Sequence, residues 1–229
     1  MSEAPRVRDA AEAAARLFVE KPGASIVMSF RAAFAGIARC VASQRNMKLH
    51  LLSGQMVMIV GMALPLDLST RVALLFAVAV VFFAEILNTG LEALVDLYIG
   101  EFHRLAMLAK DAAAAGVLVL AVATVLILGE ILWQRWDLVT DNVDAVLHSV
   151  LYGVPFVGIE ALGLFVLRRG PLALLRIAVS GGLLLPLLVR SEDPIYGAVS
   201  VLLVIVAAIS RHSFPGRMGR GAPPRKATT

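Results

Sequence analysis

Six long apolar segments constrain the fold of this chain more than any other feature. They cover residues 49–66, 72–91, 112–129, 145–167, 172–189 and 194–210, and each holds at most one Asp, Glu, Lys or Arg. A helix needs about 20 apolar residues to cross the ~30 Å hydrocarbon core of a bilayer. Hydrophobic residues make up 59% of the chain and charged residues 17%, whereas soluble domains average about 45–50% and 25%. The sequence therefore predicts an all-α, polytopic membrane bundle and argues against a nucleic-acid-binding protein.

The distribution of positive charge predicts how this bundle is oriented. With the N-terminus in the cytoplasm, 18 of the 21 Lys and Arg residues fall in the segments expected inside, and the outside loops hold only Arg71, Arg135 and Arg190. Cytoplasmic loops of membrane proteins carry such an excess of positive charge. We therefore expect a multi-pass protein of a bacterial cytoplasmic (inner) membrane with both termini in the cytoplasm.

Two amphipathic stretches and a basic tail flank the spans. Residues 1–24 predict a cytoplasmic surface segment, and residues 29–50 predict a second surface helix with its apolar side chains on one face. Residues 213–229 are rich in Gly, Pro and Arg, a composition typical of disorder. Trp133 and Trp136 lie where an aromatic belt is expected at the outer interface.

Acidic and amide side chains form a line in the second predicted span. Glu85, Asn88, Glu92 and Asp96 follow at offsets of 3, 7 and 11 residues, which places them within a stripe about 80° wide on one helix face. Charges inside a span cost about 2.5–3.5 kcal/mol on insertion scales, so they call for a reason. Glu85 is expected inside the cytoplasmic half of the bilayer, and Glu92 at its inner boundary.

This placement suits chemistry on a lipid headgroup. A carboxylate in apolar surroundings is a stronger base, and a second carboxylate at the water boundary can hold Mg²⁺ together with substrate phosphates. Lys110 supplies a cation for phosphate. Structural alternatives remain open: Asn88 can bridge helices, Asp111 can cap the third span, and His103 and Lys110 can be interfacial residues.

The motif Glu85-Ile-Leu-Asn88-Thr-x-x-Glu92-x-x-x-Asp96, followed by Glu101-Phe-His103 and Lys110-Asp111, resembles the prokaryotic diacylglycerol kinase and undecaprenol kinase family. Residues 29–37 and the run from Arg45 to His50 resemble the undecaprenol kinase branch. The similarity covers about residues 25–132, which it identifies as a lipid kinase domain with three transmembrane helices. The remaining membrane region, residues 133–212, is then an accessory domain with about three further helices.

The resemblance implies an integral-membrane homotrimer that transfers phosphate from ATP, with Mg²⁺, to diacylglycerol or undecaprenol. It implies that Glu85 is the general base, that Asn88 supports the base and the metal, and that Glu92 binds Mg²⁺ and ATP phosphates. It further implies a nucleotide site formed by Glu101, Phe102, His103, Lys110 and Asp111. The chain departs from the family at Gln44, where an acidic metal ligand is usual; an amide oxygen can bind Mg²⁺ and ATP there but carries less charge.

Two other functions remain open from the sequence. The first is a proton- or cation-conducting bundle that uses Glu85, Asn88 and Glu92 as its path. The second is a membrane scaffold with a degenerate kinase site. This alternative is suggested by Gln44, which stands where the family usually has an acidic metal ligand. In the accessory region Glu160 is the one acid within the last three spans, and we expect it to pair with Arg176 or Arg168. The sequence does not identify the lipid alcohol.

Overall fold

The computed structural model describes residues 25–99, 103–166, 171–191 and 193–213, and helices are the only regular elements within these ranges. The chain divides into two units, residues 1–35 and 36–229. Within the first unit, the described residues form the beginning of α2 and are exposed to solvent or lipid except for one partly buried position. The helices are α2 (Ile26–Ser43), α3 (Arg45–Ala63), α4 (Leu68–Tyr98), α5 (Arg104–Gln134), α6 (Trp136–Asp141), α7 (Val143–Phe165), α8 (Pro171–Arg190) and α9 (Pro194–Ser213).

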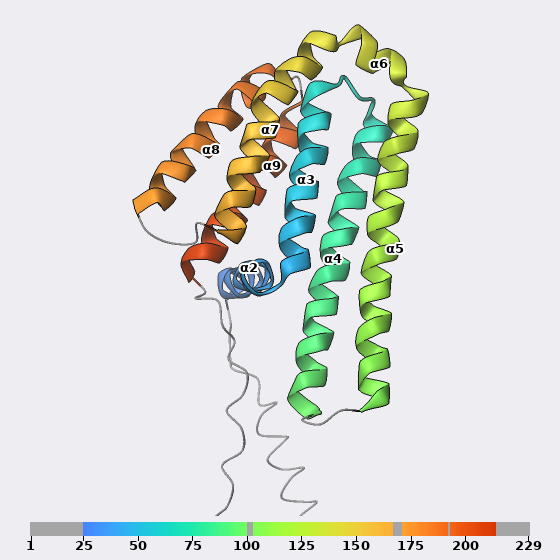
Figure 1. Ribbon diagram of the computed structural model, residues 1–229, viewed down its shortest axis with the longest axis vertical. Coiled ribbons are helices and arrows are strands. Elements are labelled where there is room, and N and C mark those ends of the chain that lie inside the picture. Colours follow the sequence, from blue (N-terminus) through green and yellow to red (C-terminus); the bar gives the residue numbers. More distant parts are fainter. Residues whose placement is uncertain (1–24, 100–102, 167–170, 192, 214–229) are drawn as a thin grey trace, which may run out of the picture. The chain divides into compact units, whose positions relative to one another are not determined.

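Helix α3 is the centre of the second unit. It packs against α4 on one flank and against α7, α8 and α9 on the other (Figure 1). Its burial has a direct cause in the sequence, because apolar side chains lie on several sides of the helix, among them Leu51, Leu52 and Val57. Helix α5 packs mainly on α4, and among its described side chains only Val117 is buried.

A close approach and a polar clamp hold α9 against α3. A Cβ atom on Gly61 would lie 2.5 Å from the ring of Tyr196, so only glycine fits at this crossing. Farther along the same two helices, the Gln55 side-chain amide donates a hydrogen bond to the Ser200 backbone carbonyl at 3.0 Å. The Ser200 hydroxyl in turn donates to Gln55 Oε1 at 2.6 Å. Hydrogen-bonded polar pairs of this kind join helices inside membranes, because each pair satisfies its donors and acceptors within the protein and does not expose them to lipid.

The loops at one end of the second unit are fixed by charge pairs. Asp67 caps α4 by accepting hydrogen bonds from the Ser69 hydroxyl and from the Thr70 backbone and side chain, which lower the pKa of the Asp67 carboxyl. Arg71 forms an ion pair with Asp193 at 2.6 Å, and Arg135 lies 3.4 Å from Asp67. Two of the three arginines predicted on the outside are therefore paired with acids of neighbouring loops.

Each of the six predicted spans coincides with a helix, and the polytopic all-α prediction is confirmed. By length and apolar composition α4, α5 and α7 are candidate membrane spans, and α9 is a shorter apolar helix. Helix α2 also qualifies as a candidate span by these criteria, although the sequence predicted a surface helix there. The two tryptophans of the predicted belt are exposed near the end of α5 and the start of α6.

Two expectations of local structure are wrong, and one helix was not predicted. The single amphipathic stretch 29–50 is broken at Gln44, which has extended backbone angles and precedes α3. Asp111 does not cap the third span, because α5 begins seven residues earlier with His103 at its N-cap. The short helix α6 was not predicted. The basic tail beyond Ser213 and the amphipathic segment 1–24 lie outside the described residues.

Candidate active site

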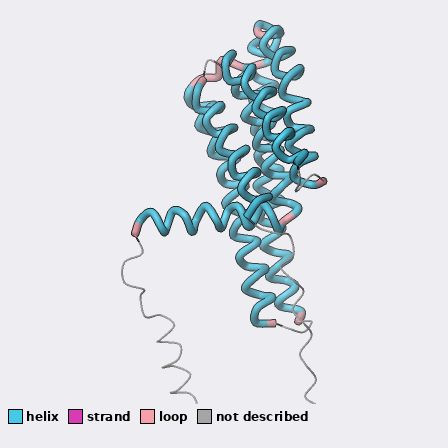
Figure 2. Tube along the Cα trace, turned by 90° about the vertical axis from the view of Figure 1, so that its left-hand side faces the viewer, coloured by secondary structure: helices cyan, strands magenta, loops and turns pink. Residues whose placement is uncertain are grey.

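The predicted polar line lies on one face of α4, and its burial decreases along the helix. Glu85 is 1% exposed and Asn88 is 5% exposed, Glu92 is partly buried, and Asp96 is exposed. At 1.5 Å per residue from Leu68, Glu85 lies ~26 Å and Glu92 ~36 Å along the helix axis. The line therefore runs from the interior of the bundle to the end of the α4–α5 hairpin, the end opposite the Asp67 loop (Figure 2).

Two amides hold the carboxylate of Glu92. Asn88 Nδ2 donates to Glu92 Oε1 at 3.2 Å, one turn away on the same helix. Gln44 Nε2 donates to Glu92 Oε2 at 3.2 Å from the break between α2 and α3. Each carboxylate oxygen thus receives one neutral hydrogen bond, which fixes the side chain without neutralising its charge.

Two buried oxygens of this face have no hydrogen-bond partner among the described residues. They are Glu85 Oε2 and Asn88 Oδ1. A buried acceptor without a partner costs about 1–3 kcal/mol, and such atoms commonly mark a place for an ion or ligand. In the part of the chain that the structure describes, no three His, Cys, Asp or Glu side chains form a metal cluster. The available ligands are instead carboxylate and amide oxygens, which are the ligands that Mg²⁺ accepts when phosphates complete its shell.

The predicted nucleotide residues are brought only partly together. Lys110 forms an ion pair with Asp96 across the α4–α5 hairpin, so its cation lies one turn beyond Glu92. His103 is exposed at the N-cap of α5, and its side chain makes no capping hydrogen bond. Asp111 is exposed inside α5. Glu101 and Phe102 lie outside the described residues.

An apolar groove reaches the neighbourhood of Glu85. It has a volume of about 330 Å³ and lies between α3, α4 and α5. Val81 and Phe82, which line it, precede Glu85 by four and three residues and so share its side of α4. The groove is lined mainly by apolar side chains, with His50, Ser53 and Thr124 as its polar members. It can hold a hydrocarbon chain whose polar end lies toward the buried carboxylate.

The accessory region contains a buried ion pair. Arg176 Nη1 lies 2.9 Å from Glu160 Oε1, which also accepts a hydrogen bond from the Ser180 hydroxyl at 2.7 Å. The pairing of Glu160 with Arg176 agrees with the sequence prediction; Arg168 lies outside the described residues. Glu160 Oε1 thus accepts from both groups, whereas Arg176 Nε has no hydrogen-bond partner among the described residues. We interpret the pair as a structural contact between α7 and α8.

Two features of the site region were missed by sequence reasoning. The pairing of Lys110 with Asp96 could have been found from the two helices, since α4 ends at Tyr98, α5 begins at Arg104, and the two pack side by side so that these positions lie opposite each other. Lys48 is 5% exposed, and its ammonium lies 5.7 Å from the centre of the Phe165 ring. Lys48 belongs to the stretch 29–50 that the sequence predicted as a surface helix, and no local pattern indicates its aromatic partner on α7.

Comparison with known proteins shows which sequence family the chain resembles. Residues 31–132 match the family described as prokaryotic diacylglycerol kinase. The chain is 39% identical over 106 residues to a diacylglycerol kinase of Synechocystis sp., which is 46% of this chain and 61% of that protein. It is 35% identical over 99 residues to the undecaprenol kinase of Bacillus subtilis, or 43% of this chain and 80% of that protein.

A third relative, the diacylglycerol kinase of Escherichia coli K12, is 38% identical over 73 residues, or 32% of this chain and 60% of that protein. The chain thus spans about three fifths of the Synechocystis and E. coli relatives. No solved structure gives a significant match. The matched part ends before α6, so helices α6 to α9 fall outside the family region.

Proposed function

Because the chain belongs to the prokaryotic diacylglycerol kinase family, we propose that it is a lipid kinase that transfers the γ-phosphoryl group of ATP to the hydroxyl of a membrane lipid alcohol. The observation that carries this proposal is the face of α4, where the buried Glu85 with a free oxygen precedes a Glu92 held by two amides. An acid of this kind beside an apolar groove suits a substrate that arrives through the bilayer.

Glu85 is the proposed general base. Its unpartnered Oε2 accepts the proton of the lipid hydroxyl as a bond forms between the lipid oxygen and the γ-phosphorus. The bond from that phosphorus to the β–γ bridging oxygen breaks, and ADP leaves with the electron pair. A base held in place and shielded from water serves a reaction that depends on positioning and charge stabilisation.

Glu92, Asn88 and Gln44 are the proposed Mg²⁺ and phosphate end of the site. The carboxylate of Glu92 and the free Oδ1 of Asn88 fit this role because both are oxygen ligands on the face that carries the base. When bound, Mg²⁺ supplies positive charge to the phosphates. Asn88 and Gln44 keep Glu92 oriented, and Glu85 lies about 10 Å away along the helix axis.

The end of α4 and the beginning of α5 are proposed to hold the nucleotide. Lys110, oriented by Asp96, offers its ammonium to the phosphates, and His103 and Asp111 face the same end of the hairpin. Glu101 and Phe102 join this set on the strength of the family resemblance. The same resemblance supports a homotrimer in the bacterial inner membrane with both termini in the cytoplasm. It also supports a kinase domain over residues 25–132 and an accessory domain over residues 133–212.

The test is transfer of labelled phosphate from ATP by the purified full chain in mixed micelles containing either diacylglycerol or undecaprenol. We expect one of the two alcohols to be labelled, since the relatives carry both names. Glu85→Gln should abolish labelling, and Lys110→Met should reduce it strongly. Glu130→Gln is the matched control, because Glu130 is exposed and belongs to the opposite end of α5.

The outcome separates the proposal from its rivals. Labelling of neither lipid, or equal labelling by the Glu85→Gln variant, would refute the kinase mechanism. Ion flux through vesicles that survives Lys110→Met would favour the conducting bundle, since a proton path needs no phosphate cation. An inactive chain that still binds lipid would indicate a scaffold.

A further inference from the structure

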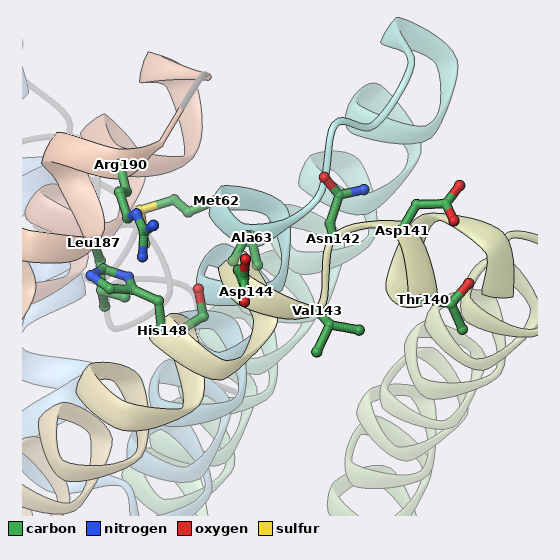
Figure 3. Close-up of a pocket in the computed structure, with 12 residues that line it drawn as sticks. Met62, Ala63, Thr140, Asp141, Asn142, Val143, Asp144, His148, Leu187 and Arg190 are labelled. Atoms are coloured by element: carbon green, nitrogen blue, oxygen red, sulfur yellow. The ribbon is translucent and has the colours of Figure 1, made fainter.

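A polar cavity lies at the end of the second unit that carries the Asp67 loop. It has a volume of about 460 Å³ and is lined from α3, α6, α7 and α8, within the range of about 300–1,000 Å³ that small-ligand sites occupy. Figure 3 shows its side chains. Most of its lining belongs to helices outside the family match, and it is at the opposite end of α4 from the Glu85 face. The proposed kinase site does not use it.

The cavity carries both signs of charge, with its arginine at one side and one of its two aspartates at the other. In Figure 3, Arg190 of α8 and His148 of α7 lie on one side, Asp141 and Thr140 at the end of α6 lie on the other, and Asp144 lies between them. Arg190 is the third arginine predicted on the outside, and unlike the other two it faces a cavity. A ligand that matches this arrangement carries an anion at one end and a cation at the other.

An apolar groove continues from this cavity along the helices. The groove has a volume of about 390 Å³ and lies between α3, the α5–α6 corner and α7. Ala63 and Ser149 line both the cavity and the groove, so the two spaces adjoin. On α7 the groove reaches Val157, ~21 Å along the helix axis from Val143. Its walls are almost entirely apolar, and Trp136 stands beside its polar end.

We propose that the cavity and the groove together bind a phospholipid with a zwitterionic amine headgroup, of the phosphatidylethanolamine type. Arg190 and His148 donate hydrogen bonds to the phosphate, and Asp144 and Asp141 pair with the ammonium group. One acyl chain occupies the groove, where it buries apolar surface on both α3 and α7. A purely anionic lipid would still reach Arg190 with its phosphate but would bring no ammonium group to pair with Asp144 and Asp141, and this selects against phosphatidylglycerol.

The test compares two lipids with the same acyl chains, phosphatidylethanolamine and phosphatidylglycerol, added to the delipidated full chain in detergent. Retained lipid is counted by native mass spectrometry, and the melting temperature is recorded in parallel. We expect the wild type to retain phosphatidylethanolamine preferentially. Arg190→Gln should weaken binding of both lipids by about tenfold. Asp144→Asn should weaken only phosphatidylethanolamine, so that its preference over phosphatidylglycerol disappears.

Matched controls use residues of the same end that do not line the cavity. Arg135→Gln and Asp137→Asn remove the same charges and should leave lipid retention unchanged. For the groove, Val150→Trp fills a lining position of α7, whereas Leu151→Trp places the same ring on an exposed position outside it. We expect only the first to displace the lipid.

Equal retention of the two lipids, or retention that survives Arg190→Gln and Val150→Trp, would overturn the proposal. Preference for phosphatidylglycerol would overturn it as well and would indicate a simple anion site. The readout is lipid binding without ATP, so it stands or falls independently of the kinase proposal. The variants also allow the two to be separated in one preparation, because none of them touches the Glu85 face.

Discussion

Replacing Gln44 by glutamate is the sharpest probe of the proposed metal site. In the structure Gln44 Nε2 donates to Glu92 Oε2 at 3.2 Å. A glutamate at this position turns the hydrogen bond into a contact between two carboxylates, and it restores the acid that is usual in the family. Without a cation the change should destabilise the protein, and with Mg²⁺ it should provide an additional charged ligand.

The size of the effect follows from that distance. Two like charges 3.2 Å apart repel by about 5 kcal/mol at an effective dielectric constant of ~20 and by about 1 kcal/mol in a water-like medium. Both side chains are partly buried, so we expect about 2–3 kcal/mol. That corresponds to a melting temperature lower by roughly 5–10 °C for a chain of this size. The same energy, recovered on metal binding, strengthens Mg²⁺ affinity by about 30-fold or more.

The assay is thermal unfolding of the wild type and the Gln44→Glu variant in EDTA and across a Mg²⁺ titration. The matched control is Gln134→Glu, because Gln134 also donates to a glutamate, Glu130, but does so at an exposed site at the other end of α5. The control should show a small change and little response to Mg²⁺. If Gln44→Glu melts like the wild type in EDTA and gains nothing from Mg²⁺, the reasoning about this site is refuted.

Three further predictions test the packing and the loops. Gly61→Ala should lower the free energy of unfolding by about 1–2 kcal/mol, because the new Cβ meets a tyrosine ring of α9. The control Gly116→Ala has open space around it and should be neutral or stabilising. Chemical unfolding measures both variants. Arg176→Met should cost about 3–5 kcal/mol by leaving the buried Glu160 carboxylate without its guanidinium, and restored stability in a double variant with Glu160→Leu checks the cause. Hydrogen bonds from a serine hydroxyl and a backbone N–H lower the pKa of Asp67. The stability that Asp67 contributes should therefore be present above the ordinary aspartate pKa of 3.8 and be lost as the pH falls below that value. A pH series of melting temperatures on the wild type and on Asp67→Asn measures this effect, and the variant should lack that part of the pH dependence.

Apolar runs predicted where helices lie better than where they end. Long apolar segments with at most one charged residue can satisfy their backbone in a bilayer only as helices, and each of the six is a helix in the structure. Helices α4 and α5 are longer than their predicted spans because the helix continues past the apolar run into sequence that carries acids and bases. Asp111 is a residue type that commonly caps helices, but the residues before it already form the first turns of α5. Asp111 therefore lies inside the helix, where it cannot act as the N-cap.

The α4 face was predictable because one helix carries it whole. Periodicity alone placed Glu85, Asn88 and Glu92 on one side. The role of Gln44 as a hydrogen-bond donor to Glu92 was not predictable. It depends on the interruption between helices α2 and α3, which places Gln44 alongside α4. The same limit applies to the cavity near Arg190, whose lining comes from four helices that no local pattern relates to one another.

The enclosure of α3 makes the two halves of this chain mutually dependent. In the segment shared with the relatives, α3 meets only α4 as a long helical neighbour, whereas here its other flank is covered by α7, α8 and α9. A chain shortened after α5 would leave the amide of Gln55 facing acyl chains and would strip Gly61 of the ring it accommodates. Within the described part of the chain α3 has thus become an inner helix, and the family region exposes most of its apolar surface on α4 and α5.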